Sequence, residues 1–175
     1  LISHPSAKEQ NTIAAPITGG PDVNNTVYTA TKTGPNQAYN GITFAPTNGT
    51  MELGTATGIA SGIWLGGTTT GNVLSNMVGG TGQQFCLRKM DSSTWTVGDI
   101  YCGFLSIEGG TLICNATMNF DYSGFRSMLG GRLTGNCRIG DGVGADIPYS
   151  FSVNDGAILS PGDNGAGAIT FEWGY

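Results

Sequence analysis

The sequence predicts an all-β protein, a right-handed β-helix or a similar solenoid, and three observations favour this class. Glycine makes up 30 of the 175 residues, about 17% against a usual ~7%. Charged residues are only 11% of the chain, and no segment has the period of a long helix. Short apolar segments recur roughly every 8–12 residues between turn residues. A β-sandwich or jelly roll with glycine in its hairpin turns is the alternative that this pattern leaves open.

The composition divides the chain into two parts. Residues 1–25 are polar and rich in turn residues, with Ile13 and Ile17 in their apolar patch, so we expect an extended N-terminal arm. Residues 26–175 are expected to form a single all-β domain, because a chain of this size can bury a core without a metal. Since Leu1 is not Met, we expect a processed end or the first residue of a fragment.

A strand–turn–strand unit recurs three times in the expected domain. Its copies are FAPTNGTM, LSIEGGTL and FSVNDGAI, at residues 44–51, 105–112 and 151–158. Each copy has β-forming residues on both sides of an x-Gly pair, which predicts a tight turn at the glycine. The last copy leads into a turn at residues 161–165 and a strand over residues 168–173, because Pro presets φ and Gly accepts positive φ.

The irregular spacing of these copies, together with their repeated Gly corner, favours the solenoid over the sandwich. Residues 26–33 are expected to form an early strand because β-forming residues follow one another there. Residues 116–136 give the least clear pattern, and residues 126–130 are the best helical candidate in the chain.

The cysteines predict two disulfides in an exported protein. Their number is even, their spacings match no zinc framework, and no CxxC is present. Three pairings are open, and small buried thiols are the alternative. The four residues are Cys86, Cys102, Cys114 and Cys137.

Several of these segments resemble the β-strand repeats of bacterial autotransporter passengers and similar extracellular β-helix proteins. The resemblance covers about residues 104–171 and is carried by residues 105–112, 131–135, 153–163 and 165–171. It implies a β-helix, export, and an extracellular or cell-surface structural role without catalytic residues. This chain departs from the family pattern in having cysteines and in ending directly after the last repeat.

No residue constellation predicts catalysis, so an enzyme is not expected. His4, the only histidine, precedes a proline in the expected arm, where nothing holds it against a nucleophile. Most acids lie beside glycine in turns, and paired-carboxylate cleavage of a polysaccharide is the enzymatic alternative. Asp141 and Asp146 partly match a calcium nonapeptide and are candidate Ca²⁺ ligands, with a plain Gly/Asp turn as the alternative. No other cofactor is expected.

Charge and hydropathy limit the expected partners. The net charge is −5 and the seven basic residues are scattered, so a nucleic-acid partner is not expected. No apolar run reaches the ~18 residues of a membrane span. Sequons at Asn24, Asn48 and Asn115 make these the glycosylation candidates of an exported glycoprotein.

These observations favour a non-enzymatic extracellular structural protein, a self-assembling subunit of a surface filament, fibre or layer. Its partner would be another copy of itself, added head to tail by strand addition. The expected interface residues lie in the arm and at the end of the chain: Ile13, Ile17, Phe171, Trp173 and Tyr175.

The alternative function is a cell-surface adhesin or carbohydrate-binding module that stacks glycans on exposed aromatic residues. Packing in a core or interface is the more usual role of such residues. The candidates are Trp64, Trp95, Trp173 and Tyr175.

Overall fold

The computed structural model describes residues 2–3, 10–13, 18–19, 25–29, 41–58, 62–79, 86–120, 126–140 and 151–172. These residues form strands and turns and contain no helix, which confirms the all-β prediction. In this described part, accordingly, no helix is long and apolar enough to cross a membrane.

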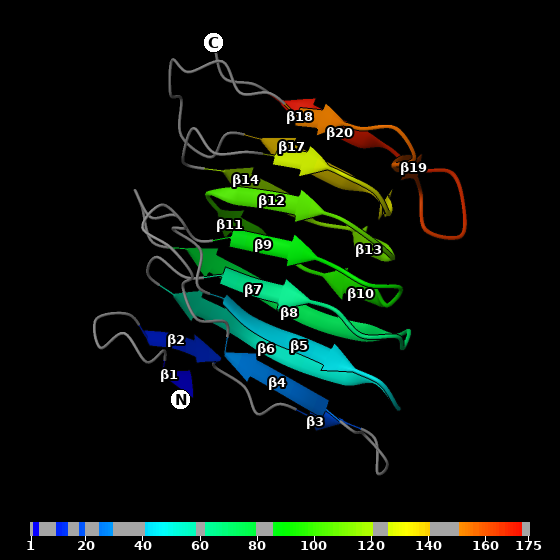
Figure 1. Ribbon diagram of the computed structural model, residues 1–175. Coiled ribbons are helices and arrows are strands. Elements are labelled where there is room, and N and C mark those ends of the chain that lie inside the picture. Colours follow the sequence, from blue (N-terminus) through cyan, green and yellow to red (C-terminus); the bar gives the residue numbers. More distant parts are fainter. Residues whose placement is uncertain are drawn as a thin grey trace.

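The described strands form two sheets, and the chain passes repeatedly from one sheet to the other (Figure 1). Each passage through both sheets adds one layer of strands, which we call a rung. The first sheet contains β4 (Asn25–Thr29), β5 (Gly41–Pro46), β7 (Gly62–Leu65), β9 (Cys86–Lys89), β12 (Phe104–Ile107), β15 (Arg126–Met128) and β18 (Phe151–Val153). From β5 to β18 every neighbouring pair is parallel. Parallel stacking of this kind is a β-solenoid and excludes the sandwich, whose strands are antiparallel.

The second sheet starts from two long strands, β6 (Met51–Gly58) and β8 (Asn72–Gly79), and then divides into two columns. One column contains β10 (Thr94–Val97), β13 (Thr111–Cys114), β16 (Arg132–Gly135) and β19 (Ile158–Pro161). The other contains β11 (Ile100–Cys102), β14 (Thr117–Phe120), β17 (Cys137–Gly140) and β20 (Ile169–Glu172). All pairs along both columns are parallel.

Side-chain amides hold the corner that separates these two columns. Asn76 Oδ1 accepts the Asp99 N–H at 3.0 Å, and Asn115 Oδ1 accepts the Asn136 N–H at 2.9 Å. In the next rung Asn136 Oδ1 accepts the Ala168 N–H at 3.1 Å. Each bond joins one rung to the next, so the corner residues satisfy backbone groups that the broken strands leave unpaired.

The core fills the space between the sheets. Along β10, β12, β13 and β14, half-buried and buried residues alternate, as expected for strands with one face inward. The inward positions are mostly aliphatic or aromatic, and Trp95 and Phe44 are the largest fully buried side chains. Burial of this continuous apolar column is the main stabilising term of the fold.

Antiparallel strands cover the N-terminal end of the solenoid. β2 (Gln10–Ile13) and β3 (Thr18–Gly19) pair with β6, β4 pairs with β5, and β1 (Ile2–Ser3) pairs with β2. The described residues of the expected arm therefore lie against the first rung. The domain boundary at residue 25 stays a prediction.

Two local predictions have opposite outcomes. The turns predicted at the x-Gly pairs are confirmed, because Gly49, Gly110 and Gly156 have φ of 70°, 62° and 83°. The helical candidate at residues 126–130 is wrong: β15 occupies its first three residues and pairs with β12 and β18. Ladder hydrogen bonds from both sides outweigh a weak local preference for helix.

Candidate functional site

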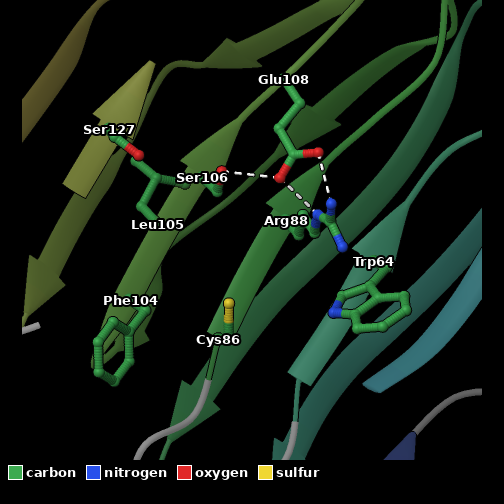
Figure 2. A pocket seen from close by; sticks show the side chains of 8 residues that line it. All are labelled: Trp64, Cys86, Arg88, Phe104, Leu105, Ser106, Glu108 and Ser127. Carbon is green, nitrogen blue, oxygen red and sulfur yellow. Dashed lines mark hydrogen bonds and ion pairs between the residues drawn. The ribbon is translucent and has the colours of Figure 1, made fainter. Parts of the chain in front are cut away.

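The outer face of β7, β9, β12 and β15 has a hollow of about 250 Å³ (Figure 2). Its lining residues are Trp64, Cys86, Arg88, Phe104, Leu105, Ser106, Glu108 and Ser127. Trp64, Arg88 and Ser106 are register partners on adjacent strands, and Cys86 and Phe104 are partners two residues earlier. The parallel register therefore brings together side chains that are distant in the sequence.

A bidentate ion pair closes one end of this hollow. Arg88 Nε and Nη2 donate to Oε1 and Oε2 of Glu108 at 2.5 and 2.7 Å, and Ser106 Oγ donates to Oε1 at 3.0 Å. The Arg88 guanidinium carbon lies 5.2 Å from the Trp64 ring centroid, within cation–π range. Its hydrogen bond to Glu108 raises the pKa of Arg88. The pair is neutral in total, and three donors satisfy the carboxylate.

The indole of Trp64 leans over Gly62. A Cβ built at Gly62 would lie 3.4 Å from Trp64 Nε1 and 3.0 Å from the Cys86 carbonyl oxygen, so glycine leaves room for the ring. Trp64 Nε1 is covered from solvent and has no hydrogen-bond partner among the described residues. In Figure 2 this nitrogen faces the Cys86 side of the hollow. An unmet buried donor costs about 1–3 kcal/mol.

The residues of this hollow were mostly missed by the sequence reasoning. Trp64 is a candidate for glycan stacking, and it lies on the outer face as that role requires. Trp95, proposed with it, is fully buried, and its Nε1 donates to the Gly66 carbonyl at 3.0 Å. The opposite charges of Arg88 and Glu108 are the one sequence signal for their ion pair. The sequence does not show which outward residues of successive rungs lie side by side, so this signal is not enough to predict the pair.

A buried lysine lies on the inner side of the same sheet. Lys89 occupies a core position between its register partners Leu65 and Ile107 and is 0% exposed. Its Nζ donates to the carbonyl oxygens of Met90 at 2.5 Å and Gly109 at 3.1 Å. Burial lowers the pKa of Lys89 to about 8, although the nearby Asp91 carboxylate acts to raise it.

The contribution of Lys89 to the free energy of unfolding is expected to rise with pH. The unfolded chain keeps this proton up to a pKa of 10.5, whereas the folded chain releases it near 8. Between these values Lys89 binds its proton more strongly in the unfolded state, so its contribution to stability increases by about 2 kcal/mol from pH ~7 to ~9.5. Urea unfolding at both pH values checks this.

Lys89→Met is the matched control, because ionisation of cysteines in the unfolded state affects both proteins equally and cancels in their difference. An equal pH dependence in the two proteins would show that Lys89 does not carry the effect.

The structure shows no disulfide among the four cysteines, which all lie in its described residues and are buried. Cys86 faces outward into the hollow, while the other three belong to the core: Cys102, Cys114 and Cys137. Cys114 and Cys137 lie in adjacent rungs. The hydrogen bond that the Cys137 thiol donates to Cys114, together with burial, raises the pKa of Cys137. Burial raises the pKa of Cys86 to about 12. These positions agree with the alternative prediction, in which the cysteines are small buried thiols.

Thiol titration of protein purified without reductant is expected to detect four thiols in concentrated guanidinium and almost none in the native state. Only a thiolate reacts quickly, and burial suppresses both its formation and its exposure. Ellman's reagent near pH ~8 measures both values. Fewer than four thiols in the denatured sample would support the disulfide prediction instead.

The other site predictions fall into two groups. Asn48 and Asn115 are both exposed, and Asn115 uses its Oδ1 in the corner bond to Asn136. Ile13 lies in β2, whose backbone pairs with β6, and Phe171 packs edge-on against Phe151 with ring centroids 5.2 Å apart. The remaining candidates lie outside the described residues: His4, Ile17, Asn24, Asp141, Asp146, Trp173 and Tyr175.

Two hollows formed by described residues contain one carboxylate each. Glu108 is the one carboxylate of the first hollow, and Asp163 is the one carboxylate of a second, of about 220 Å³, beside Arg132. Within the described residues, no group of three or more His, Cys, Asp or Glu side chains is arranged to hold a metal. Neither hollow therefore offers the acid pair that glycoside cleavage requires.

Comparison with known proteins gives no family for the chain. No family model matches it, and neither the curated proteins nor the solved structures give a match. The resemblance to autotransporter repeats therefore stays a resemblance, and function is argued from the residues and their geometry.

Proposed function

We propose that the protein is a non-enzymatic extracellular structural protein that assembles with copies of itself through the ends of its solenoid. The observation that carries this proposal is the last described rung, formed by β18, β19 and β20. Its strands pair with β15, β16 and β17 on one side, and no described strand pairs on the other. An unpaired sheet edge is a template for strand addition.

The apolar residues of this rung support the proposal. Val153 follows Ile107 and Met128 in the same inward column, yet it is 45% exposed, whereas those two residues are fully buried. Phe171 similarly follows the buried Ile139 and is 37% exposed. The core column is therefore open at this end, and a further stacked rung would remove its apolar surface from water.

The two ends of the described solenoid differ in a way that suits head-to-tail contact. β2, β3 and β4 cover the first rung with antiparallel strands, while the last rung presents parallel edges (Figure 1). Contact between unlike ends gives an open filament when successive copies stack along the solenoid axis and do not close into a ring. A second copy placing its covered end on the last rung is the assembly that we propose.

Light scattering and electron microscopy of the purified chain test this proposal. We expect concentration-dependent assembly and elongated particles. Val153→Lys places a charge in the open core column and is expected to leave a folded monomer. Ser152→Lys adds the same charge on the outward side of the same strand and is expected to assemble as the native chain does. A monodisperse monomer in the native sample would overturn the proposal.

A further inference from the structure

We propose that the hollow on the outer face of β7, β9 and β12 binds one neutral pyranose ring of a glycan. This inference does not depend on self-assembly, because the hollow lies on the side of the solenoid and the open rung lies at its end (Figure 1). It rests on the volume and lining of the hollow, the spacing of the strands that form it, and the neutrality of its polar end.

The volume of the hollow, about 250 Å³, and the spacing of its strands leave room for a single ring. β9 lies between β7 and β12 in the sheet, so the outer two strands are about 9.5 Å apart. Trp64 from β7 and Phe104 from β12 stand on either side of Cys86 in Figure 2. A ring with carbon–carbon contacts on both of its faces needs about 7–8 Å between the atoms that flank it. The lack of a side chain at Gly62 and the small side chain of Cys86 keep this space open.

The charge of the hollow favours a neutral ligand. Glu108 already accepts two hydrogen bonds from Arg88 and one from Ser106. An anion would have to displace Glu108 from Arg88, and a cation would have to displace Arg88 from Glu108, so either would break a charge-assisted bidentate pair. A neutral sugar leaves the Arg88–Glu108 pair intact. Its hydroxyls can form hydrogen bonds with the polar side chains that line the hollow.

The chemistry of a pyranose matches both parts of the lining. Its C–H face is apolar and packs on aromatic rings such as Trp64. Its hydroxyls donate and accept, and the polar groups at the closed end include the Ser106 hydroxyl and the Glu108 carboxylate.

Saturation-transfer NMR on the full chain tests the proposal with methyl glycosides of glucose, galactose, mannose and N-acetylglucosamine. We expect at least one glycoside to receive saturation, and Trp64→Ala to weaken its binding by about tenfold or more, equal to 1.4 kcal/mol. Trp64→Phe keeps an aromatic face and is expected to bind more tightly than Trp64→Ala. Ser152→Ala, on the outer face of β18 beyond the hollow, is expected to bind as the native chain does.

Three outcomes would overturn the proposal. The first is that no glycoside binds the folded native chain, and the second is that Trp64→Ala binds as tightly as the native chain while its circular dichroism is unchanged. The third uses p-cresol, which stands in for a tyrosine side chain. Binding of p-cresol in preference to every glycoside would assign the hollow to a protein partner.

Discussion

Trp95→Ala is expected to lower the free energy of unfolding by about 3–5 kcal/mol, a large share of the ~5–15 kcal/mol of a typical domain. Trp95 is fully buried, so its removal leaves a cavity between the sheets. Its Nε1 also donates to the Gly66 carbonyl at 3.0 Å, and that oxygen would lose its partner. Urea unfolding followed by circular dichroism measures the change.

Trp64→Ala is the matched comparison, because Trp64 lies on the outer face of β7 and faces the hollow. Its loss is expected to cost less than about 1.5 kcal/mol, since no cavity forms in the core. Equal destabilisation by the two substitutions would contradict the assignment of Trp95 to the core and Trp64 to the surface.

The local part of the fold could be predicted from the sequence because it depends on neighbouring residues. The x-Gly pairs at Gly49, Gly110 and Gly156 identify positions that need positive φ. The β-forming residues around them identify strands, and repetition of the unit identifies the solenoid. These signals act within about ten residues, and they were interpreted correctly.

The burial of two polar residues, Asn72 and Lys89, could not be predicted from such local signals. Asn72 takes an inward position between Met51 and Trp95, and its side chain accepts the Met51 N–H and donates to the Thr94 carbonyl. Lys89 takes another inward position and is satisfied by backbone carbonyls. A sequence pattern alone assigns Asn and Lys to the surface. Only the stacked rungs provide the partners that make their burial tolerable.

The candidate site was harder to predict because it depends on rung length. Gly62 pairs with Cys86, 24 residues later, and Cys86 pairs with Phe104, 18 residues later. Unequal rungs of this kind hide which outward residues become neighbours.

Gly110→Ala is expected to cost about 3–4 kcal/mol, although it adds a single methyl group. Gly110 has φ of 62°, and a Cβ there would lie 2.3 Å from the Ser93 carbonyl oxygen and 2.6 Å from Lys89 Nζ. The left-handed conformation alone costs a non-glycine residue about 1–2 kcal/mol. The rest comes from moving the backbone of the adjacent rung and disturbing the carbonyls that hold Lys89.

Gly156→Ala separates these two costs. Gly156 has φ of 83°, and a Cβ there would meet nothing within 4 Å, so only the conformational cost of about 1–2 kcal/mol is expected. The difference between the two substitutions in urea unfolding therefore measures how tightly the corner at Gly110 packs against the preceding rung. Equal costs would mean that this corner relaxes freely, and that the carbonyls around Lys89 Nζ are not held rigidly enough to explain its burial.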